Sequence, residues 1–390
     1  MTPLPWVFVI GRPQTRYGAQ QSLLTLLAHL DPNRVQPIVM TAGEGPVVEA
    51  LRVLGVDPVI IPTAGRDAGR GARLLSLLRG MGWVYRWLGD NPAAGLYVDT
   101  WWALLVAGVP ASLRRWPLVW YVRGEKRDVH LNTLGLALAT RVITIAEAVG
   151  QRAFYPWQRW LWGHKLVTLY TGFELPPRPA ASPAELRAQW DLPADALTIG
   201  LVGAISQRKG HDLLLAALPT ILAAHPQAML VFAGDSPPSE MAYRATLQAQ
   251  IDRLGLGSRI VWTGFVQDMA CLYPALDLVV LPSRSEGLPR VVLEALAAGR
   301  PVVATDVGGV REILRQPGLG WIVPKDRVDA LATAVIEALA TPDTPALQAA
   351  RRQFVATHFS IPTFVEGFTQ ILEQMPHRTL PVSAPSHAQG

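Results

Sequence analysis

Short apolar runs rich in Val, Ile and Leu recur along this sequence of 390 residues, and segments long enough for helices separate them. The runs in the first half are WVFVIG, PIVMTA, LYVDT, PLVWYVRG and RVITIA, and those in the second half are LTIGLVG, AMLVFAGD, RIVWTG, DLVVLPS and RPVVATD. Strand and helix signals that alternate in this way predict parallel sheets covered by helices. We therefore expect an α/β fold.

A proline-rich stretch, GFELPPRPAASPAE, separates the two series of runs and reads as an interdomain linker. A chain of this length is also too long for one ordinary core. We predict a first domain over 1–172, a linker over 173–183, a second domain over 184–358 and a disordered tail over 376–390. Two doubly wound domains would bind ligands at the carboxyl ends of their strands and face each other across a cleft.

Cysteine content and hydropathy indicate where the protein works. Cys271 is the single cysteine and cannot form an internal disulfide, which predicts a reducing cytoplasm. The opening MTPLPWVFVI lacks the basic segment of a secretory signal. The longest apolar stretch, residues 101–113, is too short and too interrupted by proline to span a bilayer. We expect a cytoplasmic protein that is soluble or peripheral to a membrane.

The first half of the chain is basic and rich in tryptophan. Residues 1–180 contain 19 Lys and Arg against 11 Asp and Glu, whereas residues 181–390 contain 16 against 19. Ten of the 13 tryptophans also lie in the first half, several of them in FYPWQRWLWGHK. Interleaved aromatic and cationic residues favour contact with the inner face of a membrane, although core tryptophans and solvated arginines would give the same counts. We predict no nucleic-acid partner.

Two glutamates stand where the predicted strand DLVVL passes into a short helix. Glu286 lies in the loop SRSEGLPR, and Glu294 lies in the second turn of a helix that we place between Pro289 and Gly299. The N–H groups at such a helix start attract anions, and carboxylates accept hydrogen bonds from hydroxyls, which together suit a nucleotide sugar. The structural alternative is that Glu294 pairs with Arg290 one turn earlier and that Glu286 caps the helix.

A second candidate site is the stretch GLVGAISQRKGHDLLLAAL. A strand ends near Gly203, the loop carries Arg208 and Lys209, and Gly210 opens a helix. The stretch contains neither G-x-x-x-x-G-K-[ST] nor G-x-G-x-x-G, which disfavours a Walker loop and a plain dinucleotide site. Adjacent cations are often solvated, but at a strand-to-helix turn of a doubly wound sheet we favour anion binding.

Signals for metals and for other catalytic classes are weak. No two aspartates are spaced D-x-D, the histidines form no H-E-x-x-H pattern, and no G-x-S-x-G elbow is present. We therefore expect no cofactor and no metal. A diphosphate leaving group would instead be stabilised by Lys209, Arg208 and helix N-termini.

On these motifs, residues 198–322 resemble the donor-binding domain of the retaining glycosyltransferases of family 4, which have the GT-B fold of two Rossmann-like domains. The resemblance rests on the two glutamates eight residues apart, on GFVQDMACLYPALDLVVLPS and on QRKGHDLLLAAL. In the first half, GAQQSLLTLLAHL is similar to the loop and helix that open the acceptor-binding domain of the family. The segment FSIPTFVEGFTQILEQM is similar to a helix that packs back on that domain, which implies such a helix at about 360–375.

The resemblance implies a role for each residue that matches the family motifs. Glu286 would bind donor-sugar hydroxyls beside the reacting carbon, Lys209 would neutralise the diphosphate, and Glu294 would bind the ribose. The other donor-binding residues would be Gly203, Ser206, Gly264, Phe265, Gly287, Leu288, Pro289 and Val291. On the acceptor side, Gly18 would let the first loop approach the substrates.

Two positions depart from the family pattern. The family often has an arginine directly after the glycine that ends the first donor-domain strand, where this chain has Ala204. We expect Arg208 to supply the missing charge as a third catalytic residue. The family also often has a histidine after the strand that corresponds to VWYV, where this chain has Arg123. Either Arg123 or Glu125 would then take part of that role.

We predict a retaining glycosyltransferase that moves a hexose-type sugar from a UDP- or GDP-sugar to a saccharide or lipid-linked acceptor. The leaving diphosphate would help to deprotonate the acceptor, and the product would belong to envelope polysaccharide or glycolipid synthesis. Two alternatives are a nucleotide-sugar epimerase on the same fold and a protein that binds nucleotide sugars without catalysis.

Overall fold

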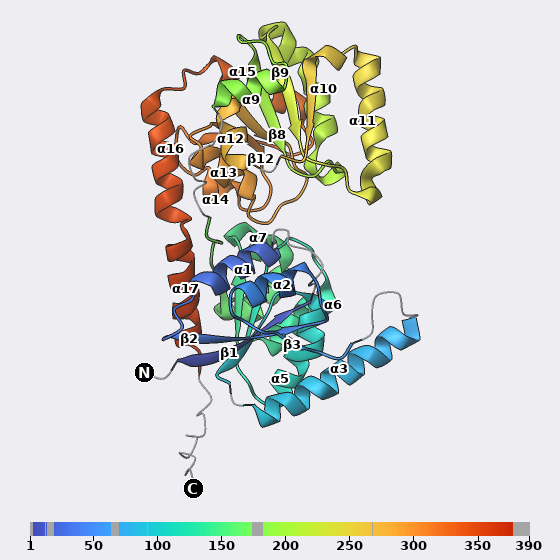
Figure 1. Cartoon of the computed structure of the whole chain (residues 1–390), viewed down its shortest axis with the longest axis vertical. Helices are drawn as coiled ribbons and strands as arrows, with labels where there is room; N and C mark the ends of the chain where they lie inside the picture. The colour runs from blue at the N-terminus through green and yellow to red at the C-terminus, as the bar shows by residue number, and fades with distance from the viewer. Residues whose placement is uncertain are drawn as a thin grey trace. The chain divides into compact units, whose positions relative to one another are not determined.

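The chain divides into two compact units in the computed structural model, which describes residues 3–11, 13, 19–63, 70–91, 93–173, 182–266 and 268–376. Unit 1 comprises Met1–Gly172 with Ile361–Gly390, and unit 2 comprises Phe173–Ser360 (Figure 1). Most of the predicted linker over 173–183 and all but the first residue of the predicted tail fall outside the described residues. Each unit contains a parallel sheet covered by helices, which confirms the predicted α/β class.

The sheet of unit 1 has seven described strands in the order β3-β2-β1-β4-β5-β6-β7, all parallel. The strands are β1 (Leu4–Ile10), β2 (Val35–Thr41), β3 (Val59–Ile60), β4 (Gly95–Val98), β5 (Leu118–Val122), β6 (Arg141–Thr144) and β7 (Leu166–Thr168). The strand order reverses between β1 and β4, as in a doubly wound sheet. Ligands bind such sheets beside the carboxyl ends of the two strands at the reversal.

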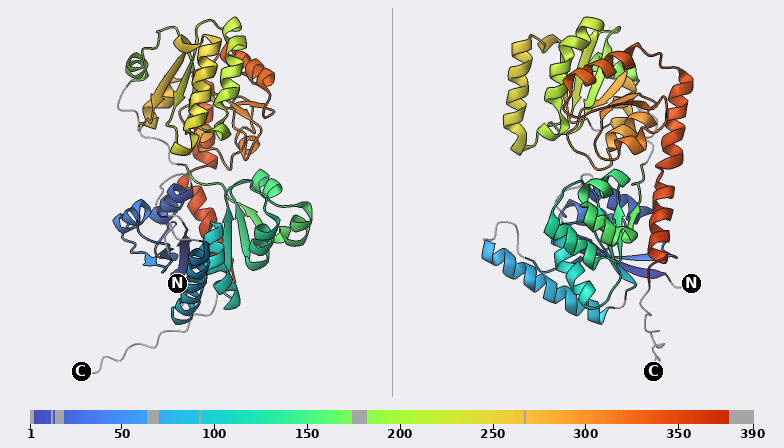
Figure 2. Two further views of the ribbon diagram at one scale, coloured as in Figure 1. Left: turned by 90° about the vertical axis from the view of Figure 1, so that its right-hand side faces the viewer. Right: turned by 180° about the vertical axis from the view of Figure 1, so that it is seen from behind.

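Helices cover both faces of this sheet (Figures 1 and 2). They are α1 (Ala19–His29), α2 (Pro46–Val53), α3 (Arg70–Asp90), α4 (Trp101–Ala103), α5 (Val109–Leu113), α6 (Val129–Leu138), α7 (Glu147–Ala153), α8 (Pro156–Trp162) and α17 (Ile361–Glu373). A π-helical segment, η1 (Leu104–Gly108), joins α4 to α5 without a break. Within the described residues, no helix is both long enough and apolar enough to cross a membrane.

The late helix α17 belongs to unit 1 although it follows unit 2 in the sequence (Figure 2). Phe368 is fully buried, and its ring centroid lies 6.1 Å from that of Phe8 on β1 and 5.7 Å from that of Tyr97 on β4. At the surface, Arg34 donates to Glu366 at 2.6 Å. Aromatic burial is the main reason why α17 docks there, because an exposed ion pair contributes little.

The sheet of unit 2 has six described parallel strands in the order β10-β9-β8-β11-β12-β13. The strands are β8 (Leu197–Val202), β9 (Ala228–Ala233), β10 (Ile260–Gly264), β11 (Leu278–Leu281), β12 (Val302–Thr305) and β13 (Gly320–Val323). The order reverses between β8 and β11. The two loops that carry most of the predicted donor-site residues therefore leave the sheet at the same point, one after β8 and the other after β11.

The helices of unit 2 follow its strands as a doubly wound fold requires. They are α9 (Pro183–Gln189), α10 (His211–Ala224), α11 (Met241–Leu254), α12 (Met269–Leu272), α13 (Arg290–Ala297), α14 (Val310–Ile313), α15 (Val328–Ala340) and α16 (Pro345–His358). On α10, Leu214, Leu218 and Ile221 recur at three- and four-residue spacing and are fully buried in the core. This packing fixes α10, and with it the loop that precedes the helix.

Candidate functional site

Two loops meet at the carboxyl edge of the sheet of unit 2, where β8 and β11 end. The loop after β8 forms a 3₁₀ turn over Gln207–Lys209, and Gly210 then begins α10 with a φ of 73°. A Cβ atom at Gly210 would lie 2.1 Å from the carbonyl oxygen of Pro282, in the loop after β11. Only glycine fits there, because the two backbones touch and the conformation is left-handed.

Arg284 ties these two loops together. Its guanidinium donates to both carboxylate oxygens of Asp212, at 3.0 and 2.8 Å, and to the carbonyl oxygen of Gln207, at 2.7 Å. Tyr243 on α11 donates to the same carboxylate at 2.6 Å. Burial alone would raise the pKa of Asp212, but hydrogen bonds from Arg284 and Tyr243 hold it below its usual value. The carboxylate therefore stays charged and keeps the bidentate pair.

Glu286 lies at the centre of the predicted catalytic group. Its Oε1 accepts hydrogen bonds from Lys209 Nζ and Ser283 Oγ, each at 2.8 Å, and its Oε2 lies 3.0 Å from Arg208 Nη1. The side chains of Lys209 and Glu286 are each 10% exposed, whereas that of Arg208 is 51% exposed. The structure thus brings the three predicted residues together. Glu286 does not cap α13, because the capping position is Pro289.

The charge of Glu286 is set by two opposing effects. Burial would raise the pKa of its carboxyl group, but Lys209 and Arg208 outweigh burial, and the pKa lies below the usual 4.5. An ionised carboxylate beside two cations leaves this part of the site with a net positive charge. Such a site can hold an anion through its cations while the carboxylate accepts hydrogen bonds from hydroxyl groups.

Glu294 lies in the second turn of α13 and is held from two sides. Its Oε2 accepts a hydrogen bond from the Tyr273 hydroxyl at 2.6 Å, and its Oε1 lies 3.6 Å from Arg290 Nε. The pair with Arg290 is the one that the structural alternative predicts. Burial, and next the nearby Glu294 carboxylate, raise the pKa of Tyr273 well above its usual value, so the phenol remains a donor. Tyr273 is not among the residues predicted from the sequence.

The backbone after Glu286 is tightly packed. Gly308 has a φ of 52°, and a Cβ atom there would lie 2.2 Å from the carbonyl oxygen of Gly287. The same carbonyl oxygen accepts a hydrogen bond from the N–H of Gly309 at 2.7 Å. The side chains of Leu288 and Pro289 are buried, so these two residues present mainly their backbone to a ligand. Val291 is half-buried in the first turn of α13.

The remaining predicted donor-site residues lie at the ends of β8 and β10. Gly203 has a φ of 135°, and a Cβ atom there would lie 3.3 Å from Lys209 Cε. The carbonyl oxygen of Ser206 accepts a hydrogen bond from the N–H of Lys209 at 2.9 Å, and the side chain of Ser206 is buried. Gly264 ends β10 with a φ of 66°, and the following Phe265 is 68% exposed. A large apolar ring so exposed beside a polar site is available for stacking.

His211, the first residue of α10, is fully buried beneath this site. Its ring packs edge-on against Phe232, with centroids 5.1 Å apart, and neither ring nitrogen has a hydrogen-bond partner of normal geometry among the described residues. Burial, and next the charge of Lys209, lower the pKa of His211 to about 4. The imidazole is therefore neutral at pH 7, and the cations of the site stay concentrated on Lys209 and Arg208.

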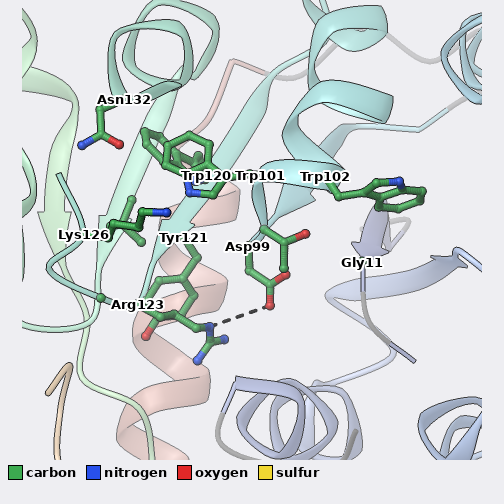
Figure 3. A pocket seen from close by; sticks show the side chains of 12 residues that line it. Gly11, Asp99, Trp101, Trp102, Trp120, Tyr121, Arg123, Lys126 and Asn132 are labelled. Atoms are coloured by element: carbon green, nitrogen blue, oxygen red, sulfur yellow. Dashed lines mark ion pairs between the residues drawn. The ribbon is translucent and has the colours of Figure 1, made fainter. Parts of the chain in front are cut away.

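Unit 1 has a pocket of about 320 Å³ at the carboxyl edge of its own sheet (Figure 3). Gly11 follows β1, Asp99 follows β4 and Arg123 follows β5, so the pocket borders the strand reversal of this sheet. The other lining side chains that Figure 3 labels are Trp101, Trp102, Trp120, Tyr121, Lys126 and Asn132. Aromatic faces beside a few polar groups are typical of sites that bind ring-shaped polar ligands.

Arg123 lines this pocket and contacts three neighbouring side chains. Its Nη2 donates to the Tyr97 hydroxyl at 3.1 Å, its guanidinium carbon lies 4.1 Å from the centroid of the Tyr121 ring, and its Nε lies 3.8 Å from Asp99 Oδ2. Burial raises the pKa of Asp99, and the charge of Arg123 opposes this rise. Arg123 was predicted from the sequence, whereas Asp99 was not. The only available signal was a strand that ends in Asp-Thr.

Of the other predicted acceptor-side residues, Glu125 does not line this pocket. Glu125 accepts a hydrogen bond from Arg152 at 2.8 Å, and its side chain is 15% exposed. Gly18 lies outside the described residues. The structure therefore favours Arg123 over Glu125 as the pocket residue. Among the described residues, no three His, Cys, Asp or Glu side chains gather as metal ligands would, and the expected independence of metal stays a prediction.

The fold and the site define a class of protein. The family described as "Glycosyl transferases group 1" matches residues 196–341, which cover most of unit 2 and both loops of the site. Solved structures, among them one of a glycosyltransferase, align with almost the whole chain. Residues 196–341 thus match a group 1 glycosyltransferase domain, the chain as a whole has the GT-B fold, and the predicted resemblance is confirmed.

Individual relatives add detail. The lipopolysaccharide core biosynthesis mannosyltransferase LpsB of Rhizobium meliloti is 34% identical over 154 residues, which cover 39% of this chain and 43% of LpsB. A GDP-mannose-dependent alpha-(1-6)-phosphatidylinositol monomannoside mannosyltransferase of Mycobacterium tuberculosis is 32% identical over 206 residues, 50% of this chain and 52% of the relative. The chain thus matches only about half, or less, of the length of these curated relatives.

The similarity to solved structures covers much more of the chain but is weaker in sequence. Alr3699/HepE of Anabaena, solved in complex with UDP, has a TM-score of 0.79 and 23% identity over 95% of this chain and all of that one. A glycosyltransferase of Rickettsia africae has a TM-score of 0.80 and 16% identity over 96% of this chain and 99% of that one. At these identities the similarity establishes the fold alone.

Proposed function

We propose that this protein is a retaining glycosyltransferase that moves a hexose-type sugar from a UDP- or GDP-sugar to a saccharide or lipid-linked acceptor. The observation that carries the proposal is the Glu286 carboxylate bound by Lys209 and Arg208 at the strand reversal of the group 1 domain. Cations that can hold a diphosphate lie within hydrogen-bond distance of an acceptor for sugar hydroxyls. The names of relatives that use GDP-mannose or bind UDP support this class of donor.

The contacts of the site suggest what each residue does when a donor binds. Lys209 and Arg208 would turn part of their charge to the diphosphate and stabilise it as it leaves. Glu286 would then accept hydrogen bonds from sugar hydroxyls. Glu294, oriented by Tyr273, would accept those of the ribose. Because Lys209 and Arg208 already supply two countercharges, we propose that transfer needs no metal.

The proposed reaction breaks the bond between the anomeric carbon and the diphosphate oxygen. A new bond forms from an acceptor oxygen to the same face of the sugar, and the acceptor proton passes to the leaving diphosphate. A front-face reaction of this kind retains the anomeric configuration without a covalent intermediate on the protein. Glu286 assists it by positioning the sugar, since its lowered pKa makes it a poor proton donor at pH 7.

We place the acceptor in the pocket of unit 1. Trp101, Trp102 and Trp120 would stack on sugar rings, while Asp99 and Arg123 would bind hydroxyls. Relatives named for lipopolysaccharide core and for phosphatidylinositol mannosides favour an acceptor of the envelope, made at the cytoplasmic face of the membrane. We accordingly propose that the protein is peripheral to that face.

Ligand-induced thermal shifts test the donor site first. Wild type and Glu294→Ala would be heated with UDP, GDP, ADP, CMP and NAD. A ligand at about a hundred times its dissociation constant stabilises a fold by roughly 2.7 kcal/mol. We expect a shift with UDP or GDP that Glu294→Ala loses. No shift with any nucleotide, from a folded protein, would refute the proposed donor site.

Product analysis then tests the reaction. With the matching nucleotide sugar and a saccharide acceptor, we expect a new glycoside whose anomeric configuration, read by NMR, equals that of the donor. Conversion of the nucleotide sugar without any acceptor would identify an epimerase instead. Binding without turnover over a broad panel of acceptors would indicate a protein that only binds nucleotide sugars.

A further inference from the structure

The long helix α3 of unit 1 carries an unusual apolar surface. Leu74, Leu75 and Leu78 are 60, 57 and 54% exposed, and Tyr85 further along the helix is 41% exposed. Figures 1 and 2 show the first half of α3 projecting from the rest of unit 1. Single exposed leucines are ordinary, but three within five residues form a patch.

The spacing of these residues places them on one side of the helix. Leu74, Leu78 and Tyr85 follow an i, i+4, i+11 pattern, which keeps them within a narrow arc of a 3.6-residue helix. The opposite side attaches α3 to unit 1 through the buried residues Ser76, Gly80, Val84 and Leu88, which are each four residues apart. The exposed stripe is therefore not the side with which α3 packs on its own unit.

The charges of α3 indicate what could cover this stripe. The helix contains four arginines and one acidic residue, Asp90, at its C-terminal end. Arg79 and Arg86 are exposed, and their positions fall beside the leucine arc. At the far end of the stripe, the guanidinium carbon of Arg114 lies 4.1 Å from the centroid of the Tyr85 ring. A partner must thus offer both an apolar layer and negative charge.

We infer that the leucine stripe of α3 (Leu74, Leu75, Leu78 and Tyr85) docks into the interface of an anionic lipid bilayer. Leucines would enter the acyl boundary while Arg79 and Arg86 meet lipid phosphates, as in amphipathic helices that lie in the membrane plane. A second copy of the chain fits less well, because α3 against α3 would oppose four arginines on each helix with a single acidic residue, Asp90. This inference rests on the peripheral location proposed above and identifies the surface responsible for it.

Vesicle co-sedimentation tests the inference on the full-length protein. The variant Leu74→Gln/Leu78→Gln removes apolar area without changing charge or helix propensity much. The matched control is Val53→Gln/Leu54→Gln, which changes two exposed apolar residues, 87 and 41% exposed, at the end of α2. We expect wild type and control to bind vesicles of phosphatidylcholine with 30% phosphatidylglycerol at low salt. The α3 variant should bind at least about tenfold more weakly.

The inference is overturned if the α3 variant binds these vesicles like wild type, or if wild type does not bind them. It is also overturned if Trp160→Gln, on the tryptophan-rich helix α8, abolishes binding while the α3 variant does not; Trp160 is 86% exposed. Wild type that dimerises in sedimentation experiments, and becomes monomeric in the α3 variant, would show that a second copy covers the stripe.

A site-specific probe separates insertion from simple adsorption. Cys271 is buried, so a Leu75→Cys variant can be labelled selectively with an environment-sensitive dye. We expect its emission to rise and shift to the blue with phosphatidylglycerol vesicles, while a label at Val53→Cys stays unchanged. Equal responses at both positions would contradict docking through α3. Nucleotide-induced thermal shifts should be the same in all these variants, so a failed donor site would be recognised separately.

Discussion

Replacing Glu286 by glutamine should destabilise unit 2 more than replacing its partner Lys209 by methionine. In Glu286→Gln, the Lys209 ammonium stays in place with its side chain 10% exposed and faces a neutral amide in place of a carboxylate. In Lys209→Met, the Glu286 carboxylate keeps the Ser283 hydroxyl at 2.8 Å and Arg208 at 3.0 Å. The first change leaves a buried charge without its counterion, whereas the second does not.

The magnitudes follow from this asymmetry. Breaking a buried ion pair from one side costs about 3–5 kcal/mol, and the amide oxygen of glutamine recovers about 1 kcal/mol as a neutral acceptor. We therefore expect Glu286→Gln to lower the free energy of unfolding by about 2–4 kcal/mol. Lys209→Met should lower it by about 1 kcal/mol, because methionine fills the space and the carboxylate retains partners. The double variant should lose at least about 1 kcal/mol less than the sum of the single variants.

Urea unfolding of the full chain at pH 7 measures these differences. Hydrogen exchange in peptides from β8 and α10 then assigns the loss to unit 2. The depressed pKa of Glu286 adds a second test, because its stabilising contribution is complete above the usual 4.5 and is lost as pH falls through its lower folded value. The difference in the free energy of unfolding between wild type and Glu286→Gln should therefore persist at pH 4.5 and disappear below that pH. Equal costs for the two single variants, or additive costs in the double variant, would refute the reasoning.

Three further predictions concern other groups. His211 has a folded pKa of about 4 against 6.5 in the unfolded chain, so the free energy of unfolding of the wild type falls as pH drops between these values. In His211→Phe this fall should be smaller by up to about 3 kcal/mol, as measured by urea titrations at pH 7 and 4.5. Tyr273→Phe should leave Glu294 without its 2.6 Å donor and weaken nucleotide binding about tenfold by calorimetry, whereas a structural role alone would leave affinity unchanged. Asp99→Asn removes the carboxylate charge 3.8 Å from Arg123 Nε but leaves the hydrogen bond of Arg123 to Tyr97 and its stacking on Tyr121. We therefore expect a higher KM for the acceptor with an unchanged nucleotide affinity. Loss of the nucleotide-induced thermal shift would contradict the division of roles between the units.

Much of the fold was predictable because buried parallel strands leave a strong signal. Ten of the strands are continuous apolar runs, and the sequence analysis identified each of them. It missed β3, β7 and β13, which have two to four residues. In so short a strand, hydrogen bonds to a neighbouring strand stabilise the conformation more than local residue preference does. Periodicity within the segment cannot reveal such contacts.

The candidate site was predictable only where its residues are close in sequence. The glutamate spacing and the Arg208-Lys209 pair are local patterns, and the structure brings Glu286 into contact with both cations. The pair of Arg284 with Asp212 spans 72 residues, and that of Tyr273 with Glu294 spans 21. An arginine in a loop and a tyrosine in a helix have many ordinary roles. Their function here follows from tertiary contacts alone.

The different surroundings of the two glutamates explain why the chain places both in one strand-to-helix connection. Glu286 is balanced by two cations, so a bound diphosphate that draws on Lys209 and Arg208 would leave its carboxylate free to accept hydrogen bonds. Glu294 instead has a phenol as its closest donor, which fixes one of its oxygens whatever the charge of the ligand. The first glutamate would therefore respond to the anionic part of a donor, while the second would hold a constant orientation. Giving Glu294 a cationic donor like those of Glu286, by Tyr273→Lys, should place a cation where the ribose is expected. We expect this variant to bind the nucleotide more weakly, even though its charge attraction to the nucleotide rises.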